Sequence, residues 1–334
     1  MPSTTREIRF ASRPTGMPTL DNFELADVPL PDPGDGEVQV ENVWMSVDPY
    51  MRGRMIDRKS YAPPFELGQP MGGGAIGRVT ASAVAGFSPG DLVQSMWGWR
   101  EAFTKPAETV ERLPAGDLPP QAFLGVAGMP GMTAYVGVTE VAKVASGETV
   151  FVSAASGAVG SLACQIAKLR GATVIGSAGG PEKTAALASF GVDVAIDYKA
   201  QPDLAGALAR AAPNGIDAYF DNVGGTHLDA ALAAAKPFAR FAECGMISQY
   251  NATAPQGPTN FALVVGKSLL LQGFIVSNYA HLRPRFVEEL RGWVASDRII
   301  WRESVVDGLE RAPEAFLNLF IGENMGKMLV RLAR

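Results

Sequence analysis

The chain is poor in the residues that bind soft metal ions or form disulfides. Its 334 residues include only two cysteines, Cys164 and Cys244, and two histidines, His227 and His281. They stand far apart in the sequence, whereas zinc sites use close pairs of such ligands. The sequence therefore predicts no metal site and no disulfide, and structural or surface roles for the histidines.

Basic charge and long apolar runs are also scarce. The net charge is −5, and no cluster of lysine and arginine marks a face for nucleic acid. The longest apolar run, Leu269–Val276, contains Gln272 and Gly273 and is too short to span a bilayer. Residues 1–13 lack the apolar segment of a secretory signal. We therefore expect a cytoplasmic protein that binds neither nucleic acid nor membranes.

The chain is long enough for two domains, and its two parts have different patterns. More than half of the 24 prolines precede residue 115, among glycine turns and alternating runs such as Glu37–Trp44. This pattern is typical of a β-rich, partly open barrel. From Thr149 to about Ser296, apolar runs alternate with helical patterns, which indicates an α/β fold with a doubly wound parallel sheet. The expected strands are Thr149–Ala154, Ala172–Ser177, Val194–Asp197, Ile216–Asn222, Phe238–Cys244 and Leu269–Val276, and the expected helices are Val159–Arg170, Glu182–Phe190, Leu204–Ala211, Leu228–Ala235 and Arg283–Ala295.

The stretch Thr149–Gly160 has the pattern of a strand, a turn of small residues and a helix that opens on Ala158. In dinucleotide-binding folds this geometry brings a pyrophosphate to backbone N–H groups at a helix N-terminus. Gly157 would let the backbone approach the phosphates. Ala155 replaces the first glycine of the usual fingerprint, so the match is partial. The candidate phosphate-binding residues are Ala155, Gly157, Ala158, Val159 and Gly160.

The end of the second expected strand lacks the acidic residue that holds the ribose of NAD. Counting about 20 residues from Ala155 leads to Ile175, and no carboxylate follows in Gly176–Gly180. A small uncharged pocket followed by Lys183 suits the 2′-phosphate of NADPH. The Tyr198 hydroxyl can donate a hydrogen bond to that phosphate, or its ring can cover the adenine. Each residue also has a purely structural interpretation, as a solvated lysine and a surface aromatic. Together with the missing acid they favour NADPH over NADH.

Short segments spread over the chain carry a more specific signal than the turn alone. They are Val47–Arg52, Gly128–Tyr135, Ala155–Ser161, Cys244–Asn251 and Glu323–Lys327. In this order they resemble segments of the zinc-free medium-chain dehydrogenases/reductases. The resemblance is to the leukotriene B4 12-hydroxydehydrogenase and prostaglandin reductase group, which includes plant alkenal double-bond reductases and bacterial curcumin-reductase-like proteins.

The resemblance implies a GroES-like barrel domain, a Rossmann domain, a homodimer, and NADPH-dependent reduction of the C=C bond of enals and enones. Zinc-binding relatives carry Cys and His in the barrel, but here neither occurs before Cys164. We assign residues 1–122 and 300–334 to the barrel domain and 123–299 to the Rossmann domain. The apolar strand Lys327–Leu332 is expected to return to the barrel, with the ligand in a cleft between the domains.

The implied chemistry is hydride transfer to the β-carbon of the substrate, with an enolate developing at the carbonyl oxygen. Without a Lewis acid, hydrogen bonds must stabilise that charge. Tyr250 is the first candidate, because ligands of doubly wound folds bind at the carboxyl ends of the strands. Tyr50, on the barrel side, is the second. Either tyrosine can instead pack at the cleft wall, and a ribose hydroxyl or water can supply the proton.

Further residues are expected around the cofactor, each with a plain structural alternative such as a helix start or a turn. Trp97, Trp99 and Phe103 are interpreted as core residues rather than a substrate pocket. The strand at Leu269–Val276 is expected to pair across a dimer axis. An NADPH-dependent quinone reductase and a non-catalytic NADPH-binding protein stay open as alternatives. The further candidate cofactor-binding residues are Met129, Thr133, Asn222, Cys244, Asn251 and Asn324.

Overall fold

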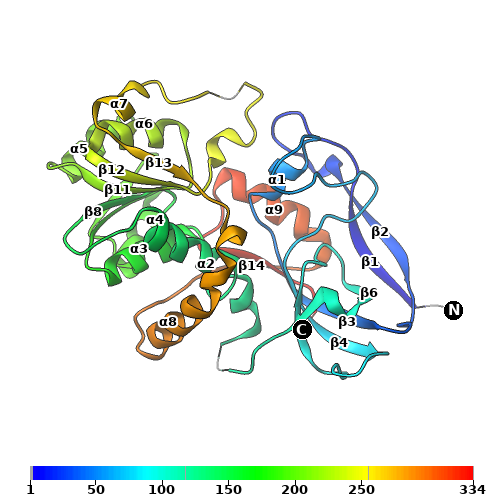
Figure 1. The fold of residues 1–334 in the computed structure, drawn as a ribbon. Coiled ribbons are helices and arrows are strands. Elements are labelled where there is room, and N and C mark those ends of the chain that lie inside the picture. Colours follow the sequence, from blue (N-terminus) through cyan, green and yellow to red (C-terminus); the bar gives the residue numbers. More distant parts are fainter. Residues whose placement is uncertain (1–2, 117, 255, 334) are drawn as a thin grey trace. The chain divides into compact units, whose positions relative to one another are not determined.

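The computed structural model describes residues 3–116, 118–254 and 256–333 and divides the chain into two compact units (Figure 1). The first unit contains the described residues of Met1–Leu124, Glu303–Asn324 and Met328–Arg334. The second contains those of Gly125–Arg302 and Met325–Lys327. No helix among the described residues is long and apolar enough to cross a membrane.

The first unit is built on antiparallel strands. Its larger sheet has the order β14-β15-β3-β4-β5-β7, with β6 beside β3, and a separate ribbon joins β1 to β2. The C-terminal strand β15 (Lys327–Arg331) pairs with β3 (Glu37–Ser46), Leu329 lying opposite Ser46. This pairing confirms the predicted return of the tail strand. The other elements of this unit are β1 (Ser3–Phe10), β2 (Phe23–Leu30), α1 (Met51–Arg54), β4 (Ala75–Ser82), β5 (Leu92–Ser95), β6 (Ala102–Pro106), β7 (Val110–Arg112), β14 (Glu303–Asp307) and α9 (Ala312–Ile321).

Aromatic packing forms the centre of the first unit. Trp99 is fully buried and stacks on Phe23 with ring centroids 5.7 Å apart, and Phe316 meets it edge-on. Phe103 is also buried, which confirms the interpretation of both residues as core. Trp97 is half-buried, and its Nε1 donates a hydrogen bond to Thr109 Oγ1 at 3.0 Å.

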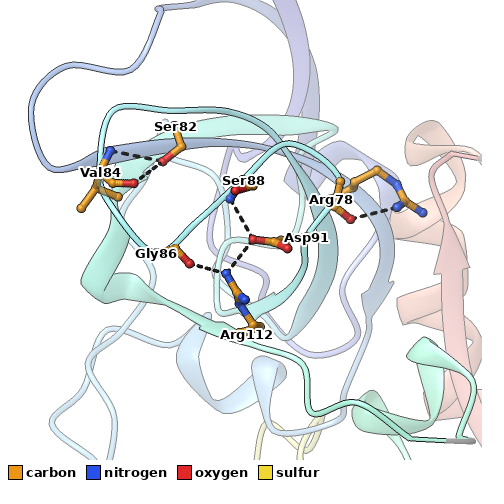
Figure 2. Close-up of polar contacts among 8 residues, drawn as sticks. Arg78, Ser82, Val84, Gly86, Ser88, Asp91 and Arg112 are labelled. Atoms are coloured by element: carbon orange, nitrogen blue, oxygen red, sulfur yellow. Dashed lines mark hydrogen bonds and ion pairs between the residues drawn. The ribbon is translucent and has the colours of Figure 1, made fainter.

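The connection between β4 and β5 is held by Asp91 and Arg112 (Figure 2). Asp91 Oδ2 accepts hydrogen bonds from the Ser88 N–H at 2.8 Å and from Arg112 Nη2 at 2.7 Å. The same guanidinium donates to the Gly86 carbonyl. These polar groups satisfy the backbone of an exposed turn, and we assign them no ligand.

The second unit is a doubly wound parallel sheet with the order β10-β9-β8-β11-β12-β13. Its pairs run parallel, and its central strands are buried, as expected for apolar runs covered on both faces. Helices α2, α3 and α8 cover one face, and α5, α6 and α7 cover the other (Figure 1). The strands are β8 (Thr149–Val152), β9 (Thr173–Ala178), β10 (Val194–Asp197), β11 (Ile216–Asp221), β12 (Ala235–Glu243) and β13 (Leu270–Gly273), and the helices are α2 (Met129–Val136), α3 (Gly160–Leu169), α4 (Pro181–Ala186), α5 (Leu204–Ala211), α6 (Gly225–Ala234), α7 (Ala262–Gly266) and α8 (Arg283–Ala295).

Several predicted boundaries in this unit are wrong by a few residues. Helix α3 begins at Gly160 rather than Ala158, because the chain must first complete the turn that follows β8. The predicted strand Leu269–Val276 is shortened to β13, because the chain leaves the sheet after Gly273 and turns into a 3₁₀ helix at Val276. The apolar pattern alone could not mark where the hydrogen-bonded ladder stops.

Candidate cofactor and active site

The turn after β8 has the shape that the glycine pattern predicted, although the first glycine is missing. Ala154 takes a left-handed conformation, with φ of +48°, and Ala155 is buried, its N–H donating to the Ser177 carbonyl at 2.9 Å. The space for the Ala155 methyl group comes from β9. A Cβ on Gly176 would lie only 2.9 Å from the Ala155 Cβ. Glycine on the neighbouring strand therefore compensates for alanine in the turn.

The start of α3 requires glycine for a steric reason. A Cβ on Gly160 would collide with the Ala154 carbonyl oxygen, so only glycine lets the helix lie this close to the turn. The C-terminal motif meets the same turn, because the Gly326 N–H donates to the Ser156 carbonyl at 2.8 Å and Gly326 forms a parallel bridge with Gly157. Two segments that are far apart in the sequence thus form one backbone surface.

Asp221, the last residue of β11, organises the loops around this surface. Its Oδ1 accepts hydrogen bonds from the N–H groups of Val223 and Gly224, both at 2.8 Å, and from the Tyr219 hydroxyl at 2.7 Å. The Ser153 hydroxyl approaches the same oxygen at 3.1 Å. A carboxyl group with this many donors is fixed in place.

The candidate Asn222 is hydrogen-bonded to Ser153, the first residue of the turn after β8, which we call the phosphate turn because the sequence predicts phosphate binding there. Its side-chain amide donates to the Ser153 carbonyl at 2.8 Å, and its backbone N–H donates to the Ser153 hydroxyl at 2.9 Å. The N–H groups of Cys244 and Gly245 donate to the Asp221 carbonyl. The loops after β8, β11 and β12 therefore meet at the carboxyl edge of the sheet, where doubly wound folds bind ligands.

The corner after β9 brings together a tyrosine and two lysines that are close in the sequence or follow the turn. A Cβ on Gly179 would lie 2.8 Å from the Tyr198 hydroxyl and 2.9 Å from Lys199 Cε, so both side chains cover this turn. Lys183 lies half-buried in α4, which starts just after the turn. Lys199 was not a candidate from the sequence, although its place next to Tyr198 could have indicated it.

An acid does stand near this corner, although none follows β9 in the sequence. Asp197 ends β10, and its Oδ1 accepts hydrogen bonds from the N–H groups of Gly180 at 2.9 Å and Lys199 at 3.0 Å. The hydrogen bond from Gly180 lowers the pKa of Asp197. This carboxylate shapes the loop through its hydrogen bonds. Counting about 20 residues from Ala155 missed it because it ends β10 rather than β9.

The first catalytic candidate, Tyr250, follows a short 3₁₀ turn after β12. Its hydroxyl oxygen accepts a hydrogen bond from the Met246 N–H at 3.4 Å, and a Cβ on Gly245 would lie 2.9 Å from the same oxygen. The phenol thus folds back over the end of β12. Asn251 is half-buried beside it in the sequence.

The second catalytic candidate, Tyr50, belongs to the first unit. It precedes α1 and packs against the buried core that contains Met51 and Phe65. Burial, with a smaller effect of Asp48, raises the pKa of Tyr50, so its hydroxyl stays protonated. Asn324 is also in the first unit, directly before the segment that bridges to the phosphate turn.

The remaining candidates lie at the start of α2 and at the end of β12. Pro130 occupies the first turn of α2, as predicted, and the Thr133 hydroxyl donates to the Met129 carbonyl at 2.7 Å. Burial raises the pKa of the Cys244 thiol to about 12. Cys244 lines a cavity of about 370 Å³ together with Glu243, Gly245, Met246, Gly273, Phe274, Ile275 and Asn278.

The soft ligands occupy separate environments. Cys164 is a buried free thiol within α3, His227 is buried on α6, and His281 is exposed. Burial lowers the pKa of His227 to about 4, so its ring is neutral at pH 7. Among the described residues, no group of three or more His, Cys, Asp or Glu side chains has the arrangement of a metal site.

Comparison with known proteins places the chain among oxidoreductases. A family described as the N-terminal domain of oxidoreductase matches residues 6–113, and one described as zinc-binding dehydrogenase matches residues 158–292. The NADPH-dependent curcumin reductase of Escherichia coli K12 is 43% identical over 332 residues, which are 97% of this chain and 95% of the relative. The 2-alkenal reductase (NADP(+)-dependent) of Nicotiana tabacum is 43% identical over 327 residues, 96% and 95% of the two chains.

A solved structure shows the same fold at similar identity. The crystal structure of CurA from Vibrio vulnificus in complex with NADPH is 44% identical, with a TM-score of 0.93, and the match covers 98% of this chain and 99% of that one. Mouse prostaglandin reductase 1 is 42% identical over 322 residues, which are 95% of each chain. The chain therefore belongs to the medium-chain dehydrogenases/reductases, in the group that contains the curcumin, 2-alkenal and prostaglandin reductases.

Proposed function

We propose that this chain is an NADPH-dependent reductase of the C=C bond in α,β-unsaturated aldehydes and ketones. The observation that carries the proposal is the similarity along nearly the whole chain to reductases named for NADPH and for curcumin or 2-alkenals. Two features of the second unit also support it: the turn after β8, proposed to bind the pyrophosphate, and the corner after β9, proposed to bind the 2′-phosphate. Both lie at the carboxyl edge of one sheet.

The second unit fits NADPH in shape and in charge. Gly160 brings the start of α3 against the turn, so the positive end of the helix dipole lies where phosphate oxygens would bind. Tyr198 and Lys199 cover the turn where NAD-binding folds place an acid, and Lys183 follows it on α4. We propose the phosphate contacts at Ala155, Gly157, Ala158, Val159 and Gly160, and further cofactor contacts at Met129, Thr133, Asn222, Cys244, Asn251 and Asn324.

When bound, NADPH supplies a hydride, which the β-carbon of the substrate accepts while the C=C electron pair moves toward the carbonyl oxygen. The chain must then stabilise the enolate and allow a proton to reach the α-carbon. We propose Tyr250 as the hydrogen-bond donor to the enolate oxygen, because it lies past the carboxyl end of β12. Tyr50 is the second candidate, and a ribose hydroxyl or water are the other sources of the proton.

We also propose the division of labour between the two parts of the chain. Residues 123–299 would form the Rossmann domain that binds NADPH. Residues 1–122 and 300–334 would form the GroES-like domain that contributes to the substrate site. The exposed edge strand β13 would pair with its copy in a homodimer, and we propose that the protein acts in the cytoplasm.

An oxidation assay tests the proposed function. NADPH and NADH consumption would be measured with an enal, an enone and a quinone as separate acceptors. We expect turnover with the enal and the enone, and a strong preference for NADPH. Turnover with the quinone alone would instead identify a quinone reductase, and tight NADPH binding without turnover would identify a non-catalytic binding protein.

A further inference from the structure

Three buried carboxyl oxygens at the carboxyl edge of the parallel sheet have no hydrogen-bond partner among the described residues. They are Asp221 Oδ2 and both oxygens of Glu243. The two acids end neighbouring parallel strands, β11 and β12, and are direct partners in the register. Partners in register point to the same face of a sheet, so the two carboxyl groups lie side by side.

The proton that such a pair needs belongs on Glu243. Asp221 Oδ1 already accepts hydrogen bonds from two backbone N–H groups and from Tyr219, whereas neither carboxyl oxygen of Glu243 accepts one from the described residues. Two adjacent buried carboxylates cannot both ionise without a large repulsion. Burial, with the charge of Asp221, raises the pKa of Glu243 to about 8. With a proton, one carboxyl oxygen of Glu243 becomes a donor that can form a hydrogen bond to Asp221 Oδ2.

The next strand leaves this carboxyl group open on its other side. The register partner of Glu243 on β13 is Gly273, and nothing lies within 4 Å of the position that a Cβ would take there. Glu243 and Gly273 both line the 370 Å³ cavity at the ends of these strands. No side chain from β13 at this register position can therefore compensate a negative charge on Glu243.

We propose that Glu243 is a positioning residue, whose protonated carboxyl group donates to Asp221 Oδ2 and thereby holds the cofactor-binding loops in place. Asp221 connects these loops directly, through the N–H groups of Val223 and Gly224 and through the Ser153 hydroxyl at the start of the phosphate turn. Loss of the proton would place a negative charge on Glu243 beside the carboxyl group of Asp221. The hydrogen bonds by which Asp221 holds the loops would then weaken. This inference rests on the proposed binding of NADPH.

The other titratable groups that face the pair do not change charge between pH 7 and pH 9. On β11, burial raises the pKa of Tyr219 well above its ordinary value, and on the β12 side burial raises that of Cys244 to about 12. On α6, burial lowers the pKa of His227 to about 4. Among the groups that face the pair, Glu243 is therefore the one whose charge changes in this range.

The test is the pH dependence of NADPH binding, measured by fluorescence titration at pH 7 and pH 9. If the bound state requires the proton, affinity falls about tenfold for each pH unit above the pKa of Glu243. We expect about tenfold weaker binding at pH 9 in the unmodified protein, and equal affinity at the two pH values in Glu243→Gln, whose amide still donates but cannot ionise. Glu288→Gln, an exposed change on α8, is the matched control and should follow the unmodified protein.

Two results would overturn the inference. One is a loss of affinity in Glu243→Gln between pH 7 and pH 9 equal to that of the unmodified protein. The other comes from infrared spectroscopy, which needs neither NADPH nor a folded variant: the unmodified protein should show the C=O stretch of a buried protonated carboxyl at pH 7 and lose it by pH 9.5, and absence of that band refutes the pair. No NADPH binding at pH 7 would instead refute the proposed function, while the infrared band would still decide the state of Glu243.

Discussion

Asp197 and Asp221 both end a strand of the same parallel sheet, and both accept hydrogen bonds from the backbone of a following or neighbouring loop. Asp197, at the end of β10, is partly exposed and lies at the corner with Tyr198 and Lys199. Asp221, at the end of β11, is fully buried beside a second acid, Glu243. An aspartate at the end of a strand thus stands in two different electrostatic environments, one partly exposed near a lysine and one buried beside a second acid.

The difference teaches how one sheet edge can bind a polyanion. At the exposed corner, the basic side chains of Lys183 and Lys199 remain accessible to water, so a phosphate can exchange with solvent there at little cost. At the buried centre, the carboxyl group of Asp221 is held by fixed donors and, in our inference, by the proton of Glu243. Perturbing the centre should therefore affect the fold, whereas perturbing the corner should affect ligand choice.

The largest effect is expected from Asp221→Ala. The change leaves the Tyr219 hydroxyl and the N–H groups of Val223 and Gly224 without their acceptor, and we expect a loss of about 3–5 kcal/mol in the free energy of unfolding. Urea denaturation followed by circular dichroism measures it. Asp229→Ala is the control, because Asp229 accepts one exposed bond from the Thr259 N–H and should cost less than about 1 kcal/mol. Equal losses would contradict the special importance of the buried Asp221 for stability.

Tyr250→Phe is expected to lower turnover about hundredfold, as loss of a general acid or oxyanion donor does, with little change in NADPH affinity. Steady-state rates with an enone, together with fluorescence titration of NADPH, separate the two effects. Tyr135→Phe is the control, because it removes a hydroxyl that donates a hydrogen bond to Glu289 at 2.8 Å and is not a candidate for the active site. If Tyr250→Phe turns over normally and Tyr50→Phe does not, the donor is Tyr50.

Lys183→Glu is expected to weaken NADPH binding about tenfold to hundredfold, since a charged hydrogen bond contributes about 1.5–3 kcal/mol. NADH, which lacks the 2′-phosphate, should bind almost as before. Titration of both nucleotides checks this difference. Lys168→Glu is the control, because Lys168, on α3, forms an ion pair with Asp193, just before β10, rather than at the corner. Equal losses for NADPH and NADH would place the 2′-phosphate elsewhere.

The smallest effect concerns the pH dependence of stability. Because the folded state raises the pKa of Glu243 from 4.5 to about 8, the folded state binds this proton more tightly than the unfolded chain. Its contribution to stability is full below pH 4.5, declines as the pH rises, and is lost once the pH passes 8. Relative to Glu243→Gln, the unmodified protein should lose about 1.4 kcal/mol of this contribution between pH 7 and pH 9. Urea midpoints at several pH values measure it, and parallel curves would contradict the raised pKa.

Local patterns were enough to predict most of the second unit. The runs Val194–Asp197, Leu204–Ala211 and Arg283–Ala295 match observed elements, because continuous apolar strands and amphipathic helices leave periodic signals. The start of α3 was harder. It depends on where the turn closes, and that closure involves the Ser177 carbonyl on another strand.

The candidate site divides along the same line. Gly157, Gly160, Lys183 and Tyr198 could be proposed from the sequence because their signals lie within one strand–turn–helix unit or a fixed distance beyond it. Asp197 and Glu243 could not, because their importance arises from neighbours that are distant in the chain. Glu243 in particular resembles any acid at a strand end until its partner in the register is known.

The sequence by itself determined the alternation of strands and helices, the glycine turn and the lack of an acid directly after β9, since each is a property of consecutive residues. Only the tertiary structure decided that Gly176 makes room for Ala155, that Gly326 closes the turn, and that Glu243 lies against Asp221. The physical reason is that sterics within a turn act over a few bonds, whereas burial and charge repulsion depend on distance in space. The protonation of a carboxyl group is therefore set by the fold, not by its neighbours in the chain.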